Sequence, residues 1–155
     1  MSRRHALAVA LAVASVLAVA CEDNVVFTAG LERQICEDSI PAACGAMARC
    51  VLDTDHYLAG RFPGGQRFLI HTTGEADIRF LVNLTDRMAP GSSLRLVVSE
   101  PSCVEKSTYD SAGRDLFQDT GPDGVVTIPI HVRKPGDHLV EINADAYCTY
   151  QLKYD

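Results

Sequence analysis

A two-residue hydrophobic period, which begins near residue 57 and continues to the C-terminus, most constrains how this chain can fold. In residues 78–84, for example, every second side chain is apolar: Ile78, Phe80, Val82 and Leu84. Such alternation is typical of a β-strand with one buried face. The same pattern predicts strands at residues 94–99, 126–132, 140–143 and 148–154, with further strands at 68–72 and 114–118.

Turn-forming clusters separate these segments, at residues 63–65, 73–74, 89–91, 121–124 and 134–137. No helical pattern lies between the strands, so antiparallel pairing is favoured over crossover units. We therefore predict a mainly all-β fold, an antiparallel, jelly-roll-like β-sandwich of about seven or eight strands over residues 57–155. Pro129 cannot donate to a ladder, so the strand at 126–132 is expected at an edge or at a bulge.

The first 20 residues predict an export signal. Residues 6–20 are apolar except for Ser15, and they follow a short basic head with Arg3 and Arg4. This run is shorter than a membrane-spanning helix needs. Cleavage before Cys21 leaves 135 of the 155 residues, which suits one domain.

The charge balance excludes polyanionic partners. Without Arg3 and Arg4, 12 of the 14 basic residues remain against 20 acidic ones, a formal charge of −8. Binding to nucleic acid needs clustered basic side chains, and the chain has three Lys in all. Attachment to a membrane is therefore expected to be covalent.

Two processing routes compete at Cys21. Residues 18–21 (AVAC) resemble the lipobox of bacterial lipoproteins, which implies lipid on the Cys21 thiol and cleavage immediately before it. An ordinary signal peptidase would instead read Ala18 and Ala20 as its small-residue pair. The apolar run reaches Cys21 without a polar spacer, which favours lipidation, although Ala18 stands where lipoboxes most often have Leu.

The other five cysteines are disulfide candidates in an exported chain: Cys36, Cys44, Cys50, Cys103 and Cys148. Lipidation of Cys21 leaves this odd number, whereas six thiols could form three bridges. Cys148 lies on the apolar face of the last predicted strand, so we expect a Cys103–Cys148 bridge across the sandwich. A second bridge is expected from Cys36 to Cys50 or to Cys44.

The N-terminal part of the mature chain divides in two. Residues 21–35 are interpreted as a tether, with a strand at 25–28, and residues 36–155 as a single domain. Residues 36–56 form a Cys-rich helical segment in which Ser39 and Pro41 start a short helix over residues 42–52. Disulfides are expected to tether that helix to the sandwich.

Carboxylates and histidines give no metal or catalytic pattern. Asp53 and Asp55 lack the further oxygen ligands of a calcium loop, and Asp119 and Asp123 are interpreted as turn residues. The histidines show no paired zinc-ligand spacing: His56, His71, His131 and His138. Residues 136–138 are interpreted as a turn, and His71 and His131 as solvated. With no nucleophile-elbow motif and no C-x-x-C pair, we predict no enzyme activity, catalytic residue, metal or cofactor.

Carbohydrate binding receives little support from the aromatic residues. Sugar platforms rely on exposed aromatic rings, and the chain has no Trp. Tyr150 and Tyr154 fall on the predicted core face, which leaves Tyr57, Tyr109 and Tyr147 as surface rings. No ligand-binding residue can be named from the sequence.

Residues 134–142 (KPGDHLVEI) and 147–152 (YCTYQL) resemble the closing hairpin of bacterial pre-peptidase C-terminal domains, and residues 74–80 (GEADIRF) are similar to another of their segments. His138 and Leu139 stand where that family usually has Tyr. The resemblance implies a jelly-roll-like accessory or binding module without catalytic residues.

The sequence therefore predicts a non-enzymatic lipoprotein of the bacterial cell envelope, anchored through Cys21 and facing the periplasm or the outside. Its work would be binding or assembly with an envelope protein or a glycan. The alternative is a freely secreted, disulfide-rich module that binds carbohydrate or inhibits an enzyme.

Overall fold

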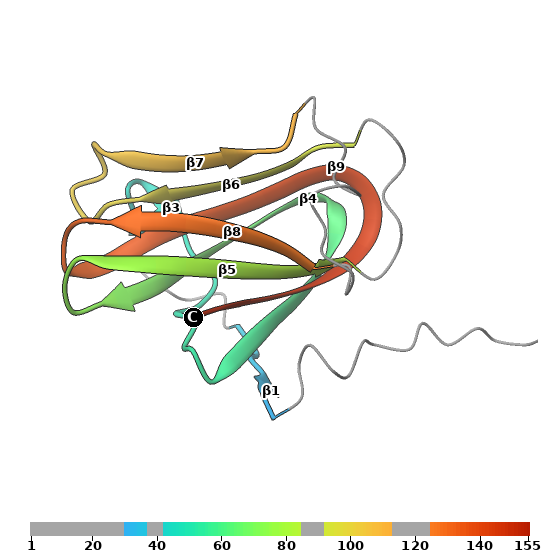
Figure 1. The fold of residues 1–155 in the computed structure, drawn as a ribbon, viewed down its shortest axis with the longest axis horizontal. Coiled ribbons are helices and arrows are strands. Elements are labelled where there is room, and N and C mark those ends of the chain that lie inside the picture. Colours follow the sequence, from blue (N-terminus) through green and yellow to red (C-terminus); the bar gives the residue numbers. More distant parts are fainter. Residues whose placement is uncertain (1–29, 37–41, 85–91, 113–124) are drawn as a thin grey trace, which may run out of the picture.

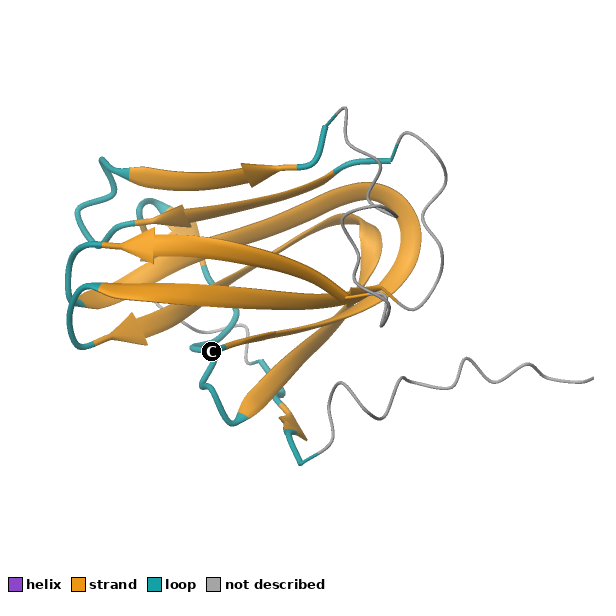
Figure 2. Ribbon diagram, in the orientation of Figure 1, coloured by secondary structure: helices purple, strands orange, loops and turns teal. Residues whose placement is uncertain are grey.

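The computed structural model describes residues 30–36, 42–84, 92–112 and 125–155. Within these residues every regular element is a strand and none is a helix (Figure 2). The strands are β1 (Glu32–Arg33), β2 (Ala42–Ala43), β3 (Ala46–Met47), β4 (His56–Thr72), β5 (Ala76–Leu84), β6 (Leu94–Ser99), β7 (Lys106–Asp110), β8 (Val125–Val132) and β9 (Gly136–Tyr154). The described part of the chain thus contains no helix that could span a membrane.

The long strands β4 and β9 organise the sheet. They pair antiparallel from Leu58 opposite Leu152 to Thr72 opposite Gly136. β9 curves as it crosses the molecule (Figure 1), and its two halves have different second neighbours. Residues 139–144 pair with β6, whereas residues 150–154 pair with β5. One seven-stranded sheet therefore folds over into two layers, with β7 beyond β6 in one and β8 beyond β5 in the other.

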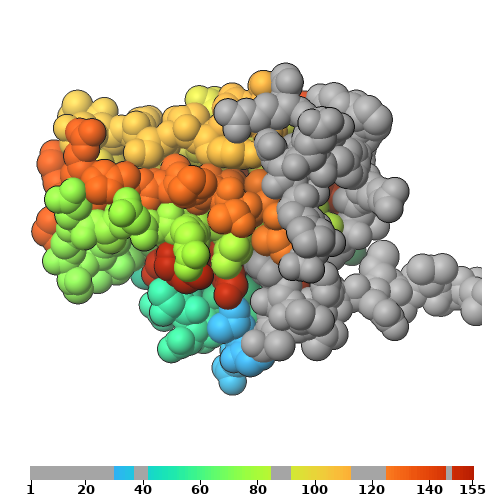
Figure 3. Space-filling view, in the orientation of Figure 1, coloured from blue at the N-terminus to red at the C-terminus, as the bar shows by residue number. Residues whose placement is uncertain are grey.

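The two layers nearly close on each other. Strands β7 and β8 lie side by side on the face seen in Figure 3 and contact each other. Between them, the Ser107 hydroxyl donates to the His131 carbonyl oxygen at 3.3 Å. The predicted antiparallel all-β fold is confirmed, in a nearly barrel-like form in which both layers belong to one continuous sheet.

Most of the predicted strands are present. β6 has the predicted bounds, and β5 and β8 extend theirs by one or two residues. The segments at 140–143 and 148–154 are two parts of β9, and 68–72 is the end of β4. Pro129 lies in β8, whose ladder partner in the sheet order is β5 alone, so its predicted edge position is confirmed. The expectations at 25–28, 89–91, 114–118 and 121–124 lie outside the described residues.

One predicted turn is wrong, and one strand of the structure was not predicted. Residues 63–65 were expected to form a turn but lie inside β4, where the register shifts between Phe62 and Gly64. Glycine at position 64, with φ of 122°, permits β4 to bend there and continue into the second layer. Strand β7 was not predicted because its sequence, KSTYD, has no apolar alternation to reveal it.

Alternating apolar side chains from both layers form the core. Phe68 and Phe80 are fully buried, and their rings meet edge to face with centroids 6.4 Å apart. Phe68 comes from the half of β4 that pairs with the β6-bonded part of β9, and Phe80 comes from β5. The contact therefore joins the two layers, as the two-residue period of each strand implies.

The helix predicted over residues 42–52 is wrong. Residues 42–47 form the β2–β3 hairpin, in which Ala42 pairs with Met47 and Ala43 with Ala46, and residues 49–52 run along β4. Cys44 and Gly45 make the turn with positive φ angles of 53° and 76°. The predicted helix start at Ser39 and Pro41 lies outside the described residues. Ala48, together with Leu69 and Leu139, forms a small second cluster that holds the hairpin on the sheet.

Two disulfides join the N-terminal segment to the fold, Cys36–Cys50 and Cys44–Cys103. The first is one of the two pairings expected for Cys36. The predicted Cys103–Cys148 bridge is wrong, because Cys103 lies in the turn after β6 and bonds the hairpin outside the sheet. Cys148 is buried in the core and lies outside both disulfides.

The end of the predicted tether takes part in the sheet. Glu32 and Arg33 form β1, which pairs parallel with His56 and Tyr57 at the start of β4. The Gln34 backbone N–H then donates to the Tyr57 carbonyl oxygen at 2.9 Å. These bonds bring Cys36 to its partner Cys50.

Candidate functional site

A solvent-open hollow of about 360 Å³ lies where the N-terminal segment meets β4 and β9. Residues from three segments line it: Met47 and Arg49; Gly65, Gln66 and Arg67; Glu141, Ile142 and Asn143. Gly65 faces Asn143 across the ladder, and a Cβ added to Gly65 would lie 2.9 Å from the Ile142 carbonyl oxygen. This glycine therefore lets the two strands approach closely and adds no side chain to the floor of the hollow.

Backbone pairing positions Arg49 beside Arg67. The Arg49 backbone N–H donates to the Arg67 carbonyl oxygen at 2.9 Å. Two further bonds of 2.8 Å, Leu69 N–H to Cys50 O and Leu52 N–H to Leu69 O, continue the pairing along β4. The segment after β3 thus adds to β4 as an extra parallel edge, which places two arginines on the rim of the same hollow.

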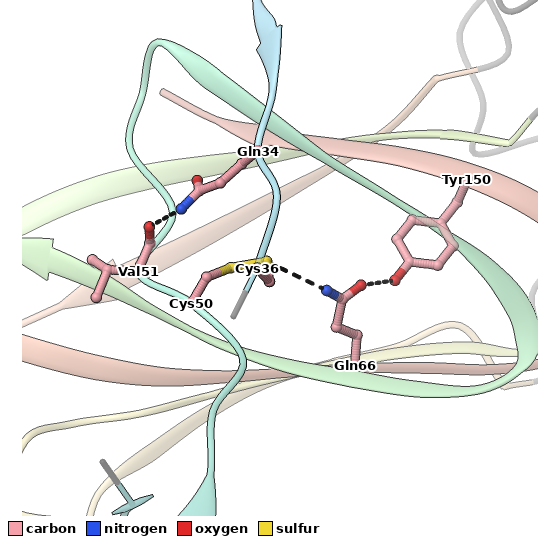
Figure 4. Close-up of a disulfide and its surroundings, with 6 residues drawn as sticks. All are labelled: Gln34, Cys36, Cys50, Val51, Gln66 and Tyr150. Carbon is pink, nitrogen blue, oxygen red and sulfur yellow. Dashed lines mark hydrogen bonds between the residues drawn. A yellow bond between two sulfur atoms is a disulfide. The ribbon is translucent and has the colours of Figure 1, made fainter. Parts of the chain in front are cut away.

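Contacts with two other segments hold the side chain of Gln66 (Figure 4). Its Oε1 accepts a hydrogen bond of 2.6 Å from the Tyr150 hydroxyl, and its Nε2 lies 4.0 Å from the Cys36 sulfur. The Cys36–Cys50 disulfide is itself flanked by Gln34, whose side-chain amide donates to the Val51 carbonyl oxygen. These contacts fix the amide of Gln66 at the wall of the hollow.

Tyr150 is a rigid support for this wall. Its ring stacks on Phe62 with centroids 4.4 Å apart and covers Gly60, where an added Cβ would lie 2.5 Å from the Tyr150 hydroxyl oxygen. Burial raises the pKa of Tyr150 to about 12, while the positive charge of Arg49 acts in the opposite direction. The phenol therefore stays protonated near neutral pH and continues to donate to Gln66.

The hollow carries more positive than negative charge. Arg67 Nε donates to Glu141 Oε1 at 2.7 Å in an exposed ion pair. Arg49 makes no ion pair with any other residue that the structure describes. Among the described residues that line the hollow, two guanidinium groups therefore meet one carboxylate, although the chain as a whole is acidic.

Sequence reasoning assigned a ligand-binding role to none of the eight lining residues. They come from three segments that are far apart in the chain, and no motif links them. The cluster at 63–65 was the one available signal, and it was interpreted as a turn. Close approach of two backbones is the other common reason for a glycine in a strand.

The acidic residues considered for a metal do not converge. Asp53 and Asp55 are exposed in the turn before β4. Within the described ranges, no group of three His, Cys, Asp or Glu side chains could hold a metal ion. Asp119 and Asp123 lie outside those ranges.

Three of the histidines occupy exposed or half-buried positions. His56 is half-buried at the start of β4, and His71 is exposed with its Nδ1 2.9 Å from Asp137 Oδ1. His131 is exposed on β8, with Nδ1 2.8 Å from Asp77 and Nε2 3.1 Å from Glu75. The predicted polar-face positions of His71 and His131 are confirmed, but carboxylates accompany both rings.

We expect His131 to titrate above its ordinary pKa of 6.5. The hydrogen bond that the His131 ring donates to Asp77 raises this pKa most, desolvation opposes the rise, and the charges of Asp77 and Glu75 add to it. The resulting stabilisation is present below pH 6.5 and is lost as the pH rises through the higher pKa of the folded state. An NMR titration of the imidazole should show this, and Asp77→Asn should return the midpoint toward 6.5. Asp137→Asn, beside His71, is the matched control, and a wild-type midpoint at or below 6.5 would contradict the prediction.

The fourth histidine belongs to a buried polar cluster that sequence reasoning missed. His138 is fully buried, with Nε2 3.0 Å from both the Thr72 hydroxyl and the Lys134 carbonyl oxygen. Its Nδ1 lies 3.5 Å from Oε2 of Glu100, which is also buried. The Thr72 hydroxyl donates to Lys134 O at 3.2 Å, so this cluster ties the end of β4 to two turns and offers no exposed nucleophile.

The tyrosines only partly match the predicted surface rings. Tyr150 and Tyr154 are buried in the core, as predicted, and burial also raises the pKa of Tyr154. Tyr57 and Tyr109 are half-buried, and the side chain of Tyr147 lies outside the described residues. None of the tyrosine rings that the structure describes lines the hollow.

No protein-family model matches the chain, and no curated protein matches it in sequence. Among solved structures, the chain is similar to the pre-peptidase C-terminal domain of a collagenase from Bacillus anthracis, with 13% identity over 76% of this chain and 100% of that chain and a TM-score of 0.46. It is also similar to CBM28, a carbohydrate-binding module specific for non-crystalline cellulose (12% identity, 74% of this chain, 76% of that chain, TM-score 0.41). A third similar structure is a family GH115 4-O-methyl-α-glucuronidase with specificity for decorated arabinogalactans (12% identity, 77% of this chain, 16% of that chain, TM-score 0.42). With TM-scores below 0.5, these matches assign neither a family nor an activity to the chain.

Proposed function

We propose that this chain is a non-enzymatic, exported lipoprotein of the bacterial cell envelope that binds a polar ligand in the hollow between Arg49 and Asn143. The hollow carries the proposal. It combines guanidinium and amide donors with the apolar Met47, which is 57% exposed, and these groups suit recognition. The described residues place no exposed nucleophile beside them.

Export is supported by the two disulfides, because such bridges persist in oxidising compartments. Attachment through Cys21 is supported by the lipobox-like residues 18–21 at the end of the apolar run. A lipid there would hold the binding domain at the envelope by a segment that begins at Glu22. The ligand would then be an envelope component or a molecule that reaches the cell.

The first test is the intact mass of the protein expressed with its own signal, measured in membrane and detergent-free fractions. We expect detergent-phase protein with lipid on an N-terminal Cys21. Protein of 135 residues without lipid in the detergent-free fraction would contradict the anchor and favour the secreted alternative.

The second test concerns binding itself. The purified processed protein is titrated with neutral and acidic oligosaccharides while backbone NMR shifts are followed. We expect at least one probe to shift resonances of Gly65, Arg67 and Asn143. Shifts confined to other surfaces, or absent with every probe, would contradict the proposed site.

A further inference from the structure

We propose that the ligand of this hollow carries a carboxylate, of the kind borne by uronic acid sugars, and that Arg49 and Arg67 bind it. The inference rests on the proposed binding function and specifies its ligand. It follows from the charge of the hollow, from the hydrogen-bond donors that remain available there and from the pairing of β4 on both of its edges.

The first argument is charge. Arg49 and Arg67 lie on adjoining segments, since the backbone N–H of Arg49 donates to the Arg67 carbonyl oxygen, and both line the hollow. Two like charges that line one hollow repel each other. Glu141 neutralises Arg67, and no carboxylate among the described residues does so for Arg49. A bound anion would supply the missing negative charge.

The second argument is the geometry of the donors. The ion pair of Arg67 with Glu141 uses Nε, and its terminal nitrogens make no hydrogen bond to any described residue. Guanidinium groups bind planar carboxylates through two parallel hydrogen bonds, which a neutral hydroxyl cannot match. Together the two arginines can therefore hold one carboxylate at the rim of the hollow.

The third argument favours a sugar over a peptide. A peptide in extended form binds to a free strand edge. At the hollow, however, β4 pairs with β9 on one side and with the Arg49 segment on the other, and on that outer segment the Val51 carbonyl oxygen already accepts from the Gln34 side-chain amide. Recognition must then come from side chains, and the amide of Asn143 is suited to the hydroxyls of a sugar ring.

The test compares trigalacturonic acid with its fully methyl-esterified form by calorimetry, using the processed full-length protein. We expect the acid to bind at least about tenfold more tightly than the ester, since hydrogen bonds to charged groups are the stronger ones. Arg49→Gln and Arg67→Gln should each weaken binding of the acid by about tenfold and leave that of the ester nearly unchanged. Arg61→Gln is the matched control, because Arg61 is an exposed arginine of β4 that does not line the hollow.

Each other outcome overturns the inference in a recognisable way. Equal binding of acid and ester, with shifts at Gly65 and Asn143, would reject the carboxylate and keep the binding function. An equal loss in Arg61→Gln would assign the effect to general attraction of anions. Preference for an acidic peptide over the sugar would reject the carbohydrate, and no binding of either sugar would reject the inference itself. Failure of the binding function is recognised separately, when none of the wider set of probes shifts the hollow.

Discussion

Glu100→Ala is expected to lower the free energy of unfolding by about 2–5 kcal/mol, since each polar group that loses its partner inside the protein costs about 1–3 kcal/mol and this substitution affects two. Glu100 is 6% exposed, and its Oε1 accepts the Arg133 backbone N–H at 2.8 Å. Its Oε2 faces His138 Nδ1 at 3.5 Å. Alanine would leave the Arg133 N–H without its acceptor and the buried His138 Nδ1 without its partner, and unsatisfied polar groups inside a protein are costly.

The positions of the protons on His138 explain why the Glu100 carboxylate stabilises this cluster. The Lys134 carbonyl can only accept, so His138 Nε2 carries a proton to bond it at 3.0 Å. A neutral ring would then present a lone pair on Nδ1 to the oxygen of Glu100. The contact is attractive when one further proton lies between Nδ1 and Oε2. Glu100→Gln should therefore destabilise less than Glu100→Ala, because its amide can donate to a neutral Nδ1.

Chemical denaturation followed by far-ultraviolet circular dichroism measures these changes, since the chain has no Trp to report by fluorescence. Glu105→Ala is the control: this exposed carboxylate pairs with Lys134 Nζ at 3.1 Å. Exposed pairs contribute about 0–1 kcal/mol. If Glu100→Ala lowers the free energy of unfolding no more than Glu105→Ala does, the buried contact contributes no more stability than the exposed ion pair.

Removal of the Cys44–Cys103 disulfide should cost about 4 kcal/mol, and removal of Cys36–Cys50 about 3 kcal/mol, in the chain-entropy account. The difference arises because the cysteines are separated by 59 residues in the first bridge and by 14 in the second. Two double variants measure it by denaturation, Cys44→Ala with Cys103→Ala and Cys36→Ala with Cys50→Ala. A larger loss from the shorter loop would contradict this account.

Hydrogen exchange separates the local effects of the two bridges. Cys44 is in the turn of the β2–β3 hairpin, and Cys103 follows Glu100 in the turn after β6. Loss of this bridge should speed exchange at Ala43 and Met47. Loss of Cys36–Cys50 should instead affect Gln34 and the wall of the hollow at Gln66, where the Cys36 sulfur makes its contact.

The sequence determined the strands whose two faces differ in polarity. The buried faces of β5 and β8 alternate with charged or polar residues, so hydrophobic burial alone sets their register. Pro129 on the edge strand follows from its missing N–H. Where alternation fails, as in β7, sequence reasoning found no strand.

The structure alone decided the hairpin and the disulfides. Residues 42–52 have good helix propensity, but propensity is weak beside tertiary contacts. Cys44 is bonded to Cys103, Ala48 packs on Leu69, and Arg49 pairs with β4, all of which require an extended segment. Cys148 has the apolar surroundings predicted for it, yet no local signal shows that Cys103 faces away from the core.

The hollow and the buried cluster also depend on the tertiary structure. Arg49 and Arg67 are 18 positions apart and meet because an extra segment pairs with the edge of β4. Glu141 belongs to β9, near the C-terminus, and lies opposite Arg67 in the β4–β9 ladder. Glu100 and His138 meet because β6 pairs with β9, where Ser99 lies opposite Leu139. Local patterns in the sequence show which side chains are buried. Pairing between strands that are far apart in the chain decides which polar groups share one site. Such long-range pairing produces no periodic pattern in the sequence, so it cannot be predicted from one.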